Sequence, residues 1–231
     1  VKPSGYPYLV MELLEGEDLR HMIKARGALS LTETLNMVDE VARGLEAAHA
    51  LGIIHRDIKP PNIFLAGERW KILDFGLSKS DGEHTSITKG SAVGTPGFMA
   101  PEQALAEAVD HRCDVFGLAA VAYAALTGRV PFSGTDSIEV MVNVVSLQPA
   151  AASTLAGVHP DVDLVLALGL AKHVAARPES ALGFASLLRA AAVGALEEPT
   201  RRAAEELVAL HPWDSSAGVE VGPRWSPSCQ T

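Results

Sequence analysis

The fold of this chain is decided by the segment IIHRDIKPPNIFLAGERWKILDFG, which runs from Ile53 to Gly76. Four polar residues, Asp57, Lys59, Asn62 and Asp74, stand between short apolar runs that are typical of strands. Carboxylate and amide oxygens are the ligands that Mg²⁺ prefers, and a nearby lysine neutralises phosphate without competing for the metal. A single Asp before a turn is usually a turn residue, but the set of four together favours a phosphate and metal site.

Composition narrows the class of protein. The chain has 231 residues, of which 48% are hydrophobic and 20% charged, so we expect a globular chain with a sizeable core. The formal net charge of −9 argues against a nucleic-acid-binding surface, which requires a basic patch. Cys113 and Cys229 lack metal-ligand spacing and favour a reducing compartment. The longest apolar run, Val115–Leu126, is shorter than the roughly 20 residues that span a bilayer.

The first half of the chain alternates predicted strands with one helix. Ser30 and Glu33 have the spacing of a capping box, and the apolar period after them predicts a helix that ends near Gly52. The acidic, glycine-containing stretch Glu15–Asp18 is typical of a turn. The strands expected around these features are Tyr6–Leu14, which we expect to be buried, Ile53–Ile54, Ile63–Leu65 and Trp70–Leu73.

The second half is predicted to be helical. Asp114 is the expected N-cap of a buried helix over Val115–Leu126, and Gly128 is its expected end. Residues 78–97 are polar and rich in glycine, which is typical of a long functional loop. Further helices are expected at Asp136–Ser146, Asp161–Lys172, Ser180–Val193 and Glu197–Leu210, followed by a Pro/Ser/Gly-rich linker or disordered tail. We therefore predict one domain over residues 1–195 and a C-terminal helix and tail over residues 196–231.

Five motifs resemble those of eukaryotic-like (Hanks-type) bacterial serine/threonine protein kinases, in the family's order and at fitting spacing. The resemblance covers about Tyr6 to Val193. The motifs are HRDIKPPN (residues 55–62), DFG (74–76), GTPGFMAPEQ (94–103), DHRCDVFGL (110–118) and ARP (176–178).

The resemblance implies an α+β, mainly α, fold: the C-terminal helical lobe of a protein kinase with a hinge strand and short catalytic-loop strands. The N-terminal β lobe, with its glycine-rich loop and lysine, is largely absent from the sequence. We expect a kinase record cut at its N-terminus, with little transfer by the fragment itself. The alternatives are a pseudokinase-like binding or scaffold module and, less favoured, a small-molecule phosphotransferase of kinase-like fold.

The same resemblance assigns catalytic roles. Asp57 would orient the substrate hydroxyl and Lys59 would neutralise the γ-phosphate of ATP. Asn62 and Asp74 would hold Mg²⁺, for which Mn²⁺ is a possible substitute. Thr95 would hydrogen-bond near Asp57 and Lys59 and so order the substrate side.

Hinge residues would bind the nucleotide. Met11 would gate the back of the adenine pocket, and the backbone of Glu12 and Leu14 would contact the adenine edge. Asp18 would hold the ribose hydroxyls, although a solvated acidic turn explains it nearly as well. Phe64 would pack under the adenine ring, although a phenylalanine in a short strand is more often ordinary core.

Supporting contacts are also implied. His55 would pack against Phe75 rather than act as an acid or base. Asp114 would accept hydrogen bonds from the backbone of the catalytic loop. Glu102 and Arg177 would form a buried ion pair.

The expected partners are protein substrates with Ser or Thr acceptors, the chain itself among them. The loop offers Thr85, Ser86, Thr88 and Ser91, and phosphorylation at Thr88 or a neighbour would pair with Arg56. We expect no nucleic acid and no membrane segment within this chain. The kinase domain is expected in the cytoplasm, and the full-length protein could be membrane-anchored.

Overall fold

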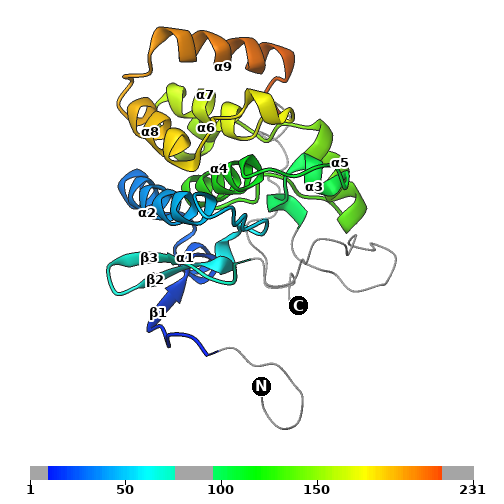
Figure 1. Ribbon diagram of the computed structural model, residues 1–231. Helices are drawn as coiled ribbons and strands as arrows, with labels where there is room; N and C mark the ends of the chain where they lie inside the picture. The colour runs from blue at the N-terminus through cyan, green and yellow to red at the C-terminus, as the bar shows by residue number, and fades with distance from the viewer. Residues whose placement is uncertain (1–9, 76–95, 215–231) are drawn as a thin grey trace.

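The computed structural model describes residues 10–75 and 96–214. Figure 1 shows a small sheet at one end, α9 at the other, and α4 between them. The architecture is mainly helical, as predicted. The helices are α1 (Leu19–Arg26), α2 (Leu31–His49), α3 (Pro101–Ala104), α4 (Arg112–Thr127), α5 (Ser137–Ser146), α6 (Ala152–Ala156), α7 (Pro160–Gly169), α8 (Ala181–Ala192) and α9 (Glu198–Leu210), with 3₁₀ turns η1 (Pro60–Asn62), η2 (Pro96–Phe98) and η3 (Val174–Ala176).

Helix α2 begins with the predicted capping box. The Ser30 hydroxyl accepts a hydrogen bond from the Glu33 amide, and the Glu33 carboxylate accepts one from the Ser30 amide. These contacts lower the pKa of Glu33 to about 2, with the Ser30 hydroxyl as the largest cause. The helix ends at His49, three residues before Gly52. Its apolar face packs against α8 and α4, which places α2 in the centre of the core.

Helix α4 is the buried axis of the molecule. Every residue from Cys113 to Leu126 is buried. The helix begins at Arg112 with His111 as N-cap, so the prediction that Asp114 caps it was wrong; Asp114 lies in its first turn. The predicted end is confirmed, because Gly128 takes a left-handed φ of 70°. A Cβ there would lie 1.7 Å from the Gly27 carbonyl oxygen, so the close approach of the loop after α1 requires glycine.

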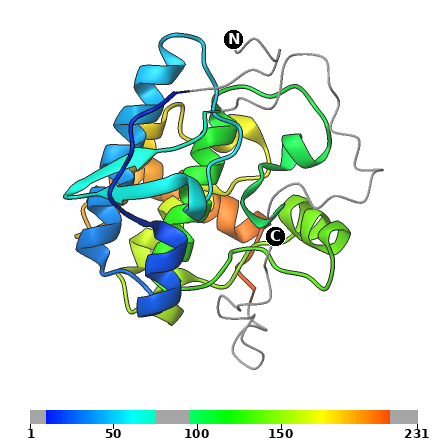
Figure 2. The same cartoon turned by 90° about the horizontal axis from the view of Figure 1, so that it is seen from below.

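The sheet has three antiparallel strands in the order β1 (Gly16–Asp18), β2 (Ile63–Ala66) and β3 (Arg69–Ile72). In its register Asp18 pairs with Phe64, and Ile63 pairs with Ile72. Strand β3 contacts α2, so the hairpin lies over the helical body, as Figure 2 shows from below. The strands predicted at Ile63–Leu65 and Trp70–Leu73 are confirmed within one residue.

Two strand predictions were wrong. Residues 10–14 form no strand, and the side chain of Leu13 is 91% exposed. Strand β1 instead forms at Gly16–Asp18, within the predicted acidic turn, because its backbone there faces β2. Residues 53 and 54 are also irregular. A strand requires a hydrogen-bonding neighbour, which a local sequence pattern does not supply. The predicted segment before residue 10 lies outside the described residues.

Sequence patterns missed α1 altogether, although its N-cap Asp18 and its C-cap Gly27 are both ordinary signals. The other helices lie close to their predicted positions, with α7 ending at Gly169 rather than Lys172. Helix α9 packs on α7, where both nitrogens at the end of the Arg201 guanidinium donate to Asp161. The chain then returns to the body, where the Asp214 amide donates to the Pro149 carbonyl.

Membrane crossing was tested on the helices of the described residues. None of them combines the length and the apolar character that a bilayer span requires.

Candidate active site

The loop before β2 is held from below by a carboxylate of α4. Asp114 accepts hydrogen bonds from the backbone amides of His55 and Arg56, each at 2.8 Å, as predicted. Its Oδ2 also lies 2.8 Å from His49 Nε2. Arg56 has a φ of 66°, a left-handed conformation that costs a non-glycine residue about 1–3 kcal/mol. Asp114 therefore fixes a strained turn immediately before Asp57.

Three of the predicted catalytic residues meet in this loop. Lys59 Nζ lies 2.8 Å from Asp57 Oδ2, and the Asn62 amide nitrogen donates to the Asp57 carbonyl oxygen at 2.8 Å. The same nitrogen lies 3.2 Å from Asp57 Oδ2. The Asp57 side chain remains 52% exposed, whereas Asn62 is buried. A half-exposed carboxylate is thus presented to solvent by a rigid support.

The β2–β3 hairpin brings Asp74 to the same edge. The Leu73 amide donates to the Asn62 carbonyl at 2.8 Å, so the residue before Asp74 lies beside Asn62. Asp74 itself has a φ of 53°, the second left-handed residue of the site. His55 Nε2 contacts the Leu73 carbonyl at 2.9 Å, and its ring meets the Phe75 ring edge-on at a centroid distance of 4.8 Å. The predicted packing of His55 and Phe75 is therefore confirmed.

The predicted nucleotide-binding residues are less closely gathered. Met11 is 65% exposed, and the Glu12 carboxylate accepts from Lys71 Nζ at 2.7 Å. Asp18 caps α1 by accepting from the His21 amide. Phe64 is half-buried in β2, and Leu14 is half-buried at the start of the described chain. Their adenine and ribose roles stay predictions.

The predicted ion pair between Glu102 and Arg177 is confirmed. The two end nitrogens of the guanidinium each donate to one Glu102 oxygen at 2.7 Å, and both side chains are buried. Arg177 also donates to the carbonyls of Ala171 and Arg112. The pair thus joins α3 to the helical body.

The donor set fits a hard divalent cation. Asn62 uses its amide nitrogen on Asp57, which leaves its amide oxygen available, and Asp74 adds a carboxylate beside it. Within the described residues, no cluster of three or more His, Cys, Asp or Glu side chains has the form of a metal cage. Mg²⁺ is usually held by one or two protein oxygens plus phosphate and water, so two ligands suffice.

Some predicted residues fall outside the described ranges, and others were missed. Thr95 and the hydroxyl residues Thr85, Ser86, Thr88 and Ser91 lie in the segment that is not described. His49 and Gln103 contact the catalytic loop or its anchor but were not predicted as site residues. The only available signal for Gln103 was a Gln at the third position of a helix that starts with proline.

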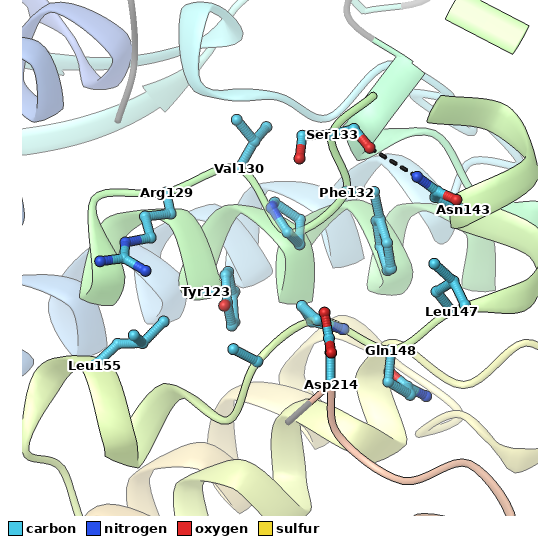
Figure 3. A pocket seen from close by; sticks show the side chains of 13 residues that line it. Tyr123, Arg129, Val130, Phe132, Ser133, Asn143, Leu147, Gln148, Leu155 and Asp214 are labelled. Carbon is cyan, nitrogen blue, oxygen red and sulfur yellow. Dashed lines mark hydrogen bonds between the residues drawn. The ribbon is translucent and has the colours of Figure 1, made fainter. Parts of the chain in front are cut away.

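A separate cavity of about 180 Å³ lies between α4, the loop before α5 and the Asp214 segment. Figure 3 shows Tyr123, Arg129 and Asp214 among its walls. Burial raises the pKa of the Tyr123 hydroxyl, which therefore stays protonated. No residue of the catalytic loop lines this cavity, so it is distinct from the candidate active site.

Lys172 anchors the end of α5. Its Nζ donates to the Val144 carbonyl at 2.8 Å and lies 4.3 Å from the centroid of the Phe132 ring. Burial, reinforced by the nearby Arg177 charge, lowers the pKa of Lys172 from 10.5 to about 7.

This shift predicts a pH dependence of stability. Between pH 7 and pH 10 the unfolded chain keeps the Lys172 proton that the folded chain has lost, so stability should rise with pH. The limit is about 1.4 kcal/mol per pH unit, and partial exposure reduces it. From pH 7 to 9 we expect wild type to gain about 1–2 kcal/mol relative to Lys172→Met in urea unfolding. The exposed control Lys24→Met should give a curve parallel to wild type; a parallel Lys172→Met curve would contradict the shift.

Comparison with known proteins agrees with this geometry. The model of the protein kinase domain family matches residues 1–165, and the chain belongs to this family. It is 36% identical over 187 residues to serine/threonine-protein kinase PknB of Mycobacterium leprae, which covers 80% of this chain and 29% of the relative. It is 36% identical over 188 residues to PknA of Mycobacterium tuberculosis, covering 81% of this chain and 43% of the relative. The chain thus spans less than half the length of these relatives.

Solved structures give the same fold. The kinase domain of M. tuberculosis PknI superimposes with a TM-score of 0.63 at 29% identity, over 79% of this chain and 65% of that one. The predicted mainly helical kinase fold and the family resemblance are therefore confirmed.

Proposed function

We propose that the protein to which this chain belongs is a serine/threonine protein kinase that transfers the γ-phosphate of ATP to protein hydroxyls. One observation carries the proposal. Asp57, Lys59 and Asn62 form a hydrogen-bonded cluster on a turn that Asp114 holds, and the hairpin brings Asp74 beside Asn62. Phosphoryl transfer needs mainly positioning and charge stabilisation, and this cluster is suited to both.

Each residue has a distinct task in this proposal. The half-exposed Asp57 carboxylate accepts a hydrogen bond from the substrate hydroxyl and orients its oxygen toward the γ-phosphorus. Lys59, now paired with Asp57, neutralises charge on the transferred phosphate. The Asn62 oxygen and the Asp74 carboxylate hold Mg²⁺, or Mn²⁺ in its place, which supplies charge neutralisation of the phosphates when bound.

The substrates follow from the same reasoning. We propose Ser and Thr hydroxyls of proteins as acceptors, including residues 85–91 of the chain itself. The relatives named serine/threonine-protein kinases support this class. We place the kinase domain in the cytoplasm, where ATP is available.

The test compares this 231-residue chain with an extended chain, which adds an N-terminal lobe carrying a glycine-rich loop and a lysine. Both are incubated with ATP and Mg²⁺, and the phosphorylated residues are identified by mass spectrometry. We expect the extended chain to phosphorylate Ser or Thr and the 231-residue chain to transfer negligibly, because one lost electrostatic contact alone costs about 10²–10³ in rate. An extended chain that binds ATP without transfer would establish the pseudokinase alternative.

A further inference from the structure

Gln103 links two parts of the site that are 47 residues apart in sequence. Its Nε2 donates to the Arg56 carbonyl oxygen at 2.8 Å, and its Oε1 accepts from the Ala100 amide at 3.1 Å. The two partners determine the amide orientation, because a carbonyl oxygen accepts only and a backbone amide donates only. The side chain therefore ties α3 to the catalytic loop.

The bonded carbonyl belongs to the peptide that precedes Asp57. Arg56 has a φ of 66°, and its amide donates to Asp114 Oδ1 at 2.8 Å. Arg56 is thus held from α4 through its N–H and from α3 through its C=O. A residue in a left-handed conformation persists only when its surroundings determine it, and Gln103 supplies the second of these two bonds.

The other end of Gln103 reaches the segment on the substrate side. Ala100 directly follows the η2 turn, and both η2 and α3 pack against α5. The Glu102–Arg177 pair fixes the same short helix to the body. Docking of residues 96–104 therefore places the Gln103 amide against the catalytic loop.

We propose that Gln103 is a positioning residue for the catalytic loop, which sets the peptide before Asp57 according to the docking of the segment that ends in α3. The proposal rests on the proposed kinase function. It predicts that Asp57 reaches its working orientation only when α3 is seated. Neither bonded atom of Gln103 belongs to the predicted nucleotide-binding residues, so the effect falls on transfer rather than on ATP affinity.

Gln103→Glu separates positioning from a merely structural role. Glutamate keeps an oxygen for the Ala100 amide, and Glu serves as well as Gln in this capping position. It loses the N–H that Arg56 requires and opposes a carbonyl with a carboxylate. In the extended chain we expect kcat to fall about 10- to 100-fold, since a displacement of about 1 Å can cost 10²-fold. KM for ATP should stay within about twofold, by the same distinction between orientation and uniform binding.

A pH profile adds a signature that helix capping lacks. Protonation gives the new glutamic acid an O–H donor for Arg56, so the ratio of variant to wild-type kcat should rise as pH falls toward about 4–5. A Gln103→Met variant loses both bonds and should show a low, pH-independent ratio. Equal kcat for wild type and Gln103→Glu would overturn the proposal, as would a flat ratio equal to that of Gln103→Met.

A second measurement needs no activity. Amide hydrogen exchange of residues 54–58 in the 231-residue chain should be faster in Gln103→Glu than in wild type, while exchange within α2 stays unchanged. Unchanged exchange in residues 54–58 would overturn the clamp even if the extended wild type proved inactive. An inactive extended wild type with faster exchange in the variant would reject the kinase function and leave the clamp established.

Discussion

Replacing Asp57 with asparagine in the extended chain is expected to lower the rate of phosphate transfer by at least about 10³-fold, toward the upper end of what a positioned acid–base group contributes. Asparagine keeps the size of the side chain but is a much weaker acceptor for the substrate hydroxyl. It also removes the charge that pairs with Lys59 at 2.8 Å. The measurement is single-turnover transfer at saturating ATP and Mg²⁺.

Stability and charge are controlled in the same experiment. The Asp57 side chain is half exposed, and ion pairs of this kind contribute about 0–1 kcal/mol, so the variant should fold normally. Glu206→Gln removes one negative charge from the exposed face of α9 and should transfer phosphate at the wild-type rate. Normal turnover by a folded Asp57→Asn variant would remove Asp57 from the mechanism.

Arg177→Ala is expected to destabilise the 231-residue chain by about 3–5 kcal/mol, since it leaves a buried Glu102 carboxylate without its counter-charge. Both members of the pair are buried, and Arg177 forms two 2.7 Å bonds to Glu102. For a chain of this size the loss corresponds to a fall in Tm of roughly 2–4 °C per kcal/mol. Urea unfolding and calorimetry both measure it.

A double variant distinguishes the unpaired charge from lost packing. Glu102→Leu combined with Arg177→Met removes both charges and keeps much of the volume, so we expect it to be more stable than Arg177→Ala alone. The exposed pair of Arg202 and Glu198 on α9 offers a control, because Arg202→Ala should cost less than about 1 kcal/mol. Equal losses for Arg177→Ala and Arg202→Ala would show that burial of the pair contributes nothing.

Short-range signals predicted the elements that depend on neighbours in sequence. The capping box at Ser30 and the left-handed stop at Gly128 are both present. The strand predicted over Tyr6–Leu14 failed for its described residues, because a strand depends on a distant partner, and β2 pairs with Gly16–Asp18 instead.

The candidate site divides in the same way. Asp57, Asn62 and Asp74 were found from motif and spacing, and the hairpin register brings Asn62 beside the residue before Asp74. The contacts of Asp114 with the loop were predicted, whereas its place in α4 was not. Gln103 escaped notice because a glutamine in a short helix carries no sign of the Arg56 carbonyl that it binds.

The central claim is that this chain holds the residues that transfer phosphate. The most direct test follows single-turnover transfer from γ-labelled ATP to a Ser/Thr protein acceptor by the extended chain, as wild type, Asp57→Asn and Asp74→Asn in parallel. The account predicts transfer to Ser or Thr by wild type, and loss of at least about 10²-fold in each variant. Transfer at the wild-type rate in both variants, or none by folded wild type that binds ATP, would contradict it.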